Sequence, residues 1–144
     1  MRAIIEQFVR VGDLKRKIGA YTESLKNFPT NAGLYLVRGI AHQADHDIRR
    51  AIADFTVSLS QAPASTYCLI FRGLAYHDAG AFEQAIADFT AAIAFSPTLS
   101  YPYHYRALSY EALGERELAK ADFGQAETYG YSPDLPVSPD VLGM

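Results

Sequence analysis

The stretch "AHQADHD", residues 41–47, contains the residue types of a metal site. His42 and His46 are four residues apart, a spacing that places two side chains on one face of an α-helix. Imidazole and carboxylate groups both bind zinc, but a zinc site needs three or four converging ligands that further hydrogen bonds hold in place. Whether such ligands converge depends on the elements that carry this stretch.

A repeated pentapeptide indicates those elements. "AIADF" occurs at 51–55 and 85–89, "AKADF" follows at 119–123, and successive copies are 34 residues apart. A fixed period of this size is typical of helical-repeat proteins. Four further series share the offset, and in the last of them a histidine stands where the other members are glycine. They are Arg38, Arg72 and Arg106; Asp54, Asp88 and Asp122; Pro29, Pro63 and Pro97; and Gly12, His46, Gly80 and Gly114.

Each period predicts two antiparallel helices. In the middle copy, apolar residues recur at helical spacing on both sides of Gly80, and Pro97 ends the second stripe. No stretch of useful length alternates as a β-strand would. Arg72 and Asp88 each lie eight residues from Gly80, so they should stand at the same height of the hairpin. We therefore predict structural ion pairs Arg38–Asp54, Arg72–Asp88 and Arg106–Asp122.

The middle copy has further residues at fixed spacings, namely Leu69, Arg72-Gly73, Tyr76, Ala85, Phe89 and Pro97. This pattern resembles the tetratricopeptide repeat. The resemblance implies an all-α fold, an α-solenoid of stacked antiparallel helical hairpins with three full repeats and one partial N-terminal repeat. The expected boundaries are a solenoid at 1–131, with repeats at about 1–31, 32–65, 66–99 and 100–131, and a proline-rich C-terminal tail at 132–144.

The two histidines of the opening stretch take ordinary places in this pattern. His42 occupies the position of Tyr76 and Tyr110 between paired helices, and His46 occupies the turn. We interpret them as one packed and one turn histidine. The alternative, a metal-dependent enzyme built on the histidines, would require four scattered residues to converge. We therefore expect no catalytic residue, no metal and no cofactor.

The resemblance also implies a function, because the first helices of such hairpins line a concave groove that binds proteins. We expect a non-enzymatic protein–protein interaction module: an adaptor, co-chaperone or assembly factor. Ile40, Leu74 and Leu108 form an aliphatic ladder that would suit an apolar peptide or an amphipathic helix. They would equally suit a core between adjacent first helices, and the sequence leaves both interpretations open. The predicted groove comprises Leu36, Ile40, Gln43, Tyr67, Ile70, Leu74, His77, Tyr101, His104, Leu108 and Glu111.

Other partner classes are disfavoured. Carboxylate-binding members of the family carry Lys, Arg and Asn at the groove positions, and this sequence lacks them there. The net charge of −3 does not favour nucleic acid, and no apolar run approaches the ~18 residues that cross a membrane. Without a visible signal peptide, we expect a cytoplasmic protein. A self-associating structural module, whose exposed faces are homo-oligomer interfaces, remains the alternative.

The two ends of the chain depart from the repeat. The last second helix carries Arg116, Lys120 and Glu127 where earlier copies are apolar, as a capping repeat requires. The apolar residues of the tail predict that it docks onto a surface. Residues 1–29 read as a degenerate copy whose first helix would contain Ile5 and Phe8.

Overall fold

The computed structural model describes residues 14–133, which form seven α-helices and no β-strand. The predicted all-α class is therefore confirmed. The described chain divides into two compact units, residues 14–64 (unit 1) and residues 65–133 (unit 2). The first helix expected around Ile5 and Phe8 lies outside the described residues, and so does the tail from residue 134 onward.

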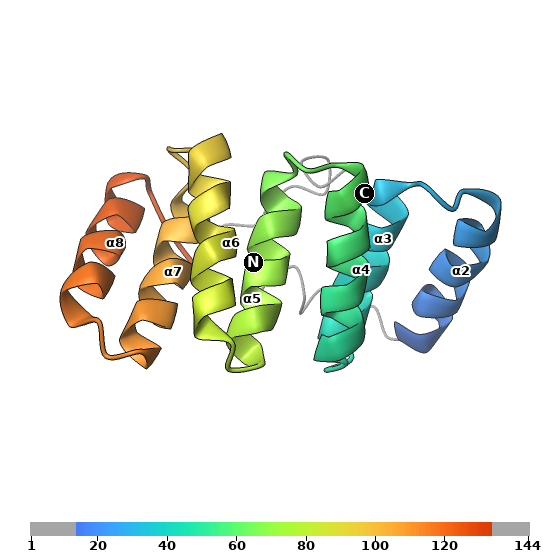
Figure 1. The fold of residues 1–144 in the computed structure, drawn as a ribbon, viewed down its shortest axis with the longest axis horizontal. Coiled ribbons are helices and arrows are strands. Elements are labelled where there is room, and N and C mark those ends of the chain that lie inside the picture. The colour runs from blue at the N-terminus through green and yellow to red at the C-terminus, as the bar shows by residue number, and fades with distance from the viewer. Residues whose placement is uncertain (1–13, 134–144) are drawn as a thin grey trace. The chain divides into compact units, whose positions relative to one another are not determined.

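Unit 1 consists of α2 (Leu14–Asn27), α3 (Ala32–Ala44) and α4 (Ile48–Gln61). Helices α3 and α4 form an antiparallel hairpin, and α2 packs against α3 (Figure 1). The predicted second helix of the partial repeat is thus present as α2.

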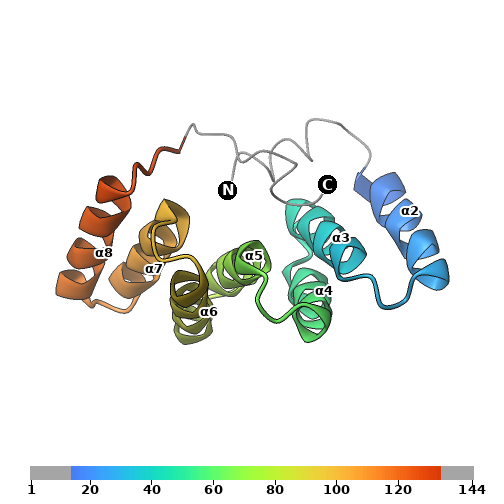
Figure 2. The same ribbon diagram turned by 90° about the horizontal axis from the view of Figure 1, so that it is seen from above.

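Unit 2 consists of α5 (Thr66–Asp78), α6 (Phe82–Phe95), α7 (Ser100–Ala112) and α8 (Arg116–Thr128). These helices form two antiparallel hairpins, α5 with α6 and α7 with α8 (Figure 2). Helix α7 packs against both α6 and α5. The first helices of the two hairpins therefore lie in direct contact.

All three hairpins turn at the predicted position. The backbone φ angle is +78° at Gly80 and Gly114 and +61° at His46. The residue after each turn then donates its N–H to a carbonyl five residues back, as from Ala81 to Tyr76 at 2.8 Å. Positive φ costs glycine little but strains a residue with a Cβ atom. The first hairpin therefore contains a local strain that the other two lack.

A missing side chain lets the paired helices approach closely. A Cβ atom on Gly73 would lie 2.6 Å from the ring of Phe89, which is completely buried. In the last hairpin Ala107 replaces this glycine, and the matching Phe123 is only partly buried. The glycine thus leaves room for a fully buried ring in the α5–α6 hairpin. The three matching pairs are Gly39 and Phe55, Gly73 and Phe89, and Ala107 and Phe123.

Candidate functional site

The predicted ion pairs are present in all three hairpins. In the α5–α6 hairpin, Nε and Nη2 of Arg72 donate to the two carboxylate oxygens of Asp88 at 2.8 and 2.7 Å. The equivalent distances are 2.8 and 2.7 Å for Arg38 with Asp54, and 2.7 and 2.8 Å for Arg106 with Asp122. A bidentate pair fixes both position and orientation, so these contacts set the register of the paired helices.

Two of these arginines, Arg38 and Arg106, also contact the helix that precedes their own hairpin. Nη1 of Arg38 donates to Oγ1 of Thr22 at 3.3 Å, and Nη1 of Arg106 donates to Oγ1 of Thr90 at 3.2 Å. The two threonines lie two periods apart, so they belong to the repeat pattern. Sequence analysis missed this series, although its 34-residue offset could have revealed it. The arginine thus stabilises both its own hairpin and the stacking of successive repeats.

Helix α8 departs from the repeat pattern. Gly124 stands where the threonine of the series would be, so α8 offers no hydroxyl to a following arginine. Arg116, Lys120 and Glu127 are all exposed on this helix. Helix α8 therefore presents charged side chains to solvent at these positions.

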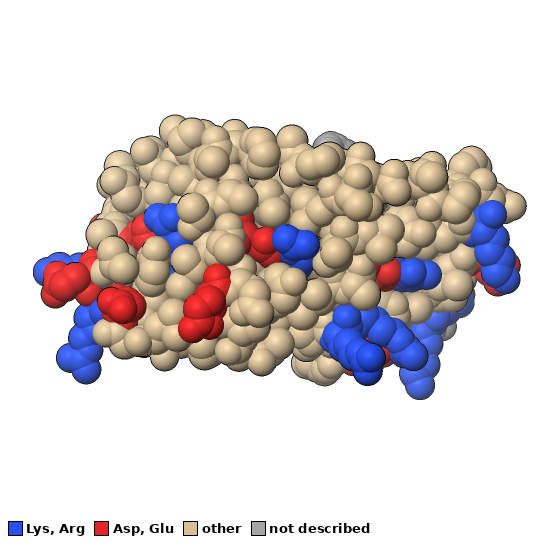
Figure 3. All heavy atoms as spheres, viewed as in Figure 1, with Lys and Arg blue, Asp and Glu red and all other residues tan. Residues whose placement is uncertain are grey.

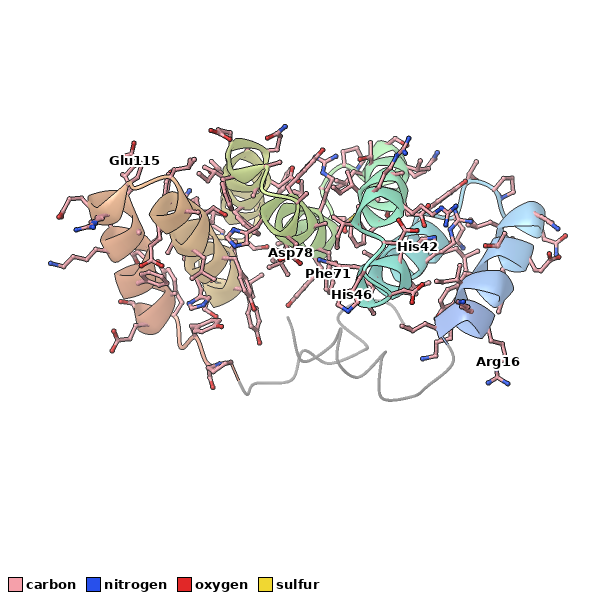
Figure 4. All side chains as sticks on the ribbon, turned by 90° about the horizontal axis from the view of Figure 1, so that it is seen from below. Arg16, His42, His46, Phe71, Asp78 and Glu115 are labelled. Atoms are coloured by element: carbon pink, nitrogen blue, oxygen red, sulfur yellow. The ribbon has the colours of Figure 1, made fainter. Side chains whose placement is uncertain are left out.

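The two histidines of "AHQADHD" occupy different environments (Figure 4). His42 is 8% exposed in α3, with its Nε2 atom 3.7 Å from Oδ2 of Asp54. Burial lowers the pKa of His42 and favours its neutral form, although Asp54 acts in the opposite direction. His46 is exposed in the turn. Among residues 14–133, no three His, Cys, Asp or Glu side chains converge in a way that could hold a metal ion.

The predicted groove residues of unit 1 are all buried. Leu36 and Ile40 are 6% and 0% exposed, and Gln43 is 4% exposed. Neither polar atom of the Gln43 amide has a hydrogen-bond partner in the structure. The side chains of Leu36 and Ile40 are therefore packing residues, as the core interpretation requires.

The predicted groove residues of unit 2 fall into a packed and an accessible group. Ile70 and Leu74 are 0% and 2% exposed, whereas Leu108 is only partly buried. Nδ1 of His77 lies 3.0 Å from Oγ of Ser109, which connects α5 to α7. The aliphatic ladder is thus mostly packing, and the accessible groups of unit 2 lie elsewhere on the same helices.

Besides the partly buried Leu108 and the exposed Glu111, the accessible groups are aromatic. The ring of Tyr131 lies parallel to that of His104, with ring centres 3.8 Å apart and planes 8° apart. Tyr131 also meets the edge of Tyr101 at 5.9 Å. Burial raises the pKa of Tyr101, and the nearby Tyr67 and Tyr131 raise it further. We call Tyr67, Tyr101, His104 and Tyr131 the aromatic surface.

Three members of the aromatic surface are only partly buried, and burial lowers the pKa of His104, which favours a neutral ring. The predicted groove included Tyr67, Tyr101 and His104 but not Tyr131, which stands at the repeat position of Pro63 and Pro97. Such rings offer flat apolar area beside polar hydroxyl groups. This combination suits binding better than catalysis.

Comparison with known proteins agrees with the fold. Residues 67–99 match the family model of the tetratricopeptide repeat. A crystal structure of MamA is 20% identical, with a TM-score of 0.80 over 88% of this chain and 74% of that one. The first TPR of Spaghetti (RPAP3), bound to the HSP90 peptide SRMEEVD, is 22% identical, with a TM-score of 0.68 over 69% of this chain and 79% of that one. A search of curated proteins finds no match.

The resemblance inferred from the sequence is therefore confirmed: hairpin α5–α6 is a tetratricopeptide repeat, and the chain has the helical-repeat fold of these proteins. Along the described chain, every helix is too short or too polar to cross a membrane.

Proposed function

We propose that this chain is a non-enzymatic protein-interaction module that binds an apolar peptide or an amphipathic helix at the aromatic surface of unit 2. The observation that carries the proposal is the stack of His104, in α7, on Tyr131, three residues after α8: both rings are partly open to solvent and lie beside the buried Tyr101. A tetratricopeptide-repeat fold, and the peptide bound to the first TPR of Spaghetti, support a peptide as the kind of partner.

Rigid aromatic rings are effective binding groups. A tyrosine presents a large apolar area with few rotatable bonds, and its hydroxyl can hydrogen-bond the backbone of a bound segment. Here the rings already contact one another, so binding would order few additional side chains. The buried Ile70 and Leu74 enter the proposal only as the packing beneath these rings.

The charge of unit 2 disfavours acidic ligands. Residues 65–133 contain four Lys and Arg against eight Asp and Glu, and Arg72 and Arg106 are already paired with aspartates. The other two cations, Arg116 and Lys120, lie on α8 and outside the aromatic surface, so an acidic peptide such as SRMEEVD would meet net repulsion there. We therefore expect an apolar segment with neutral or basic flanks.

The test is a peptide screen followed by substitution of one tyrosine. Peptides selected on the purified protein should bind at least about tenfold more weakly to Tyr131→Ala, as expected for a central aromatic contact. Tyr129→Ala is the matched control, because Tyr129 is 38% exposed, contacts Tyr103 and lies outside the aromatic surface. SRMEEVD should not bind either protein. Equal losses in both tyrosine variants, or no loss in Tyr131→Ala, would overturn the proposal.

A further inference from the structure

One position of the repeat reverses its charge between the two units. The second residue of each second helix is Lys15 in α2, Arg49 in α4, Glu83 in α6 and Glu117 in α8. Successive members are 34 residues apart, and all four side chains are exposed. Unit 1 therefore presents cations at the place where unit 2 presents anions.

Neighbouring residues add to both charges, and Asp47 beside Arg50 and Arg116 between Glu115 and Glu117 offset only part of them. Arg16 and Arg50 follow the two cations of unit 1, and Glu115 directly precedes α8. In Figure 3, Lys and Arg spheres gather where α2 and α4 begin, and in Figure 4, Arg16 and Glu115 point away from their helices. We call Lys15, Arg16, Arg49 and Arg50 the basic edge, and Glu83, Glu115 and Glu117 the acidic edge.

The charges of whole units follow the same division. Residues 14–64 contain seven Lys and Arg against four Asp and Glu, and residues 65–133 contain four against eight. The chain's net charge of −3 conceals this difference. The electrostatic potential is therefore positive for unit 1 by itself and negative for unit 2 by itself, and such potentials can steer association.

Cations in the first turn of a helix are unfavourable for folding, although at α4 Asp47 caps the helix and pairs with Arg50 at 3.1 Å. Helix N-termini carry partial positive charge, so they favour anions and disfavour cations. The first turns of α2 and α4 contain no acidic residue, whereas those of α6 and α8 contain Glu83 and Glu117. A bound anionic surface would offset the repulsion among the cations of the basic edge.

We propose that the basic edge of one copy of this chain binds the acidic edge of a second copy. Charge complementarity selects this partner, because both edges use one repeat position and each spaces its two charges by one 34-residue period. Two ion pairs can therefore form together. Leu113 and Leu118, 40% and 49% exposed beside the acidic edge, add apolar area to this contact. The proposal does not depend on the aromatic surface.

The experiment is sedimentation velocity of the full chain and two charge-reversed variants. The first variant replaces Lys15, Arg16, Arg49 and Arg50 by Glu, and the second replaces Glu83, Glu115 and Glu117 by Lys. Circular dichroism checks that each is folded. The control exchanges Glu23 and Lys26, an exposed pair near the other end of α2, and conserves the net charge.

If the two edges bind each other, the samples should differ in association in a defined way. The wild-type chain and the control should associate at about 50 mM salt and dissociate at about 500 mM, where charges are more strongly screened. Each variant alone should associate at least about tenfold more weakly, because like charges then face each other. An equimolar mixture of the two variants should regain association, since one then presents only acidic edges and the other only basic edges.

Three results would overturn the proposal. A wild-type chain that is monomeric at low salt excludes it. So does a folded variant that associates as tightly as the wild type. A mixture that stays monomeric, when each variant alone has lost association, would show that the edges do not bind one another.

Discussion

Gly73→Ala tests the close packing of the hairpin. The new Cβ atom would lie 2.6–2.9 Å from three atoms of the Phe89 ring, well inside van der Waals contact. Overpacking of a filled core costs about 1–3 kcal/mol. Because alanine is the better helix former by about 1 kcal/mol, we expect a net loss of unfolding free energy of up to about 2 kcal/mol.

Gly124→Ala is the matched control in the same unit. No atom lies within 4 Å of a Cβ added at Gly124, which is also inside a helix. This variant should therefore be stabilised by about 0.5–1 kcal/mol through helix propensity alone. The difference between the two variants isolates the packing cost, which we expect to be about 1–3 kcal/mol.

Chemical denaturation followed by circular dichroism measures both values. A second substitution identifies the clashing group: Phe89→Leu should cost less in the Gly73→Ala background than in the wild type, because the ring that collides is gone. If Gly73→Ala stabilises the protein as much as Gly124→Ala does, the Phe89 ring does not fill the space beside Gly73 and the packing argument is refuted.

Three further predictions concern strain, pH and burial. His46→Gly should raise the unfolding free energy by about 0.5–1 kcal/mol in denaturation curves, because glycine adopts the positive φ without strain; a loss would contradict this. Burial lowers the pKa of His42, which faces Arg38 and Asp54. The contribution of neutral His42 to the unfolding free energy is therefore complete above the unfolded pKa of about 6.5, and it is lost as the pH falls through the lowered pKa of the folded protein. Between about pH 7.5 and pH 5.5, the melting temperature of His42→Tyr should therefore fall less than that of the wild type. Leu74→Glu should unfold unit 2 in circular-dichroism melting, since Leu74 is 2% exposed and a buried unpaired charge costs several kcal/mol; a folded variant that loses peptide binding would instead place Leu74 in the groove.

Features that depend only on the 34-residue repeat could be predicted without a structure. The turn at Gly80 follows from the glycine and from the stripes on either side, and the pair of Arg72 and Asp88 follows from their equal distance to that turn. Both depend on the antiparallel symmetry of one hairpin. That symmetry is local, since it involves two helices that adjoin in the sequence.

The sequence by itself thus determined the helical repeat, the three turns and the ion pairs within hairpins. Only the tertiary structure decided which residues remain accessible. Leu74 and His104 both lie on first helices, yet Leu74 is buried and His104 stacks on Tyr131 at a partly open surface. The physical reason is that exposure depends on every neighbour that covers a side chain. Those neighbours come from distant parts of the chain: Phe89 is completely buried beside Gly73, whereas the matching Phe123, on the last described helix, is only partly buried.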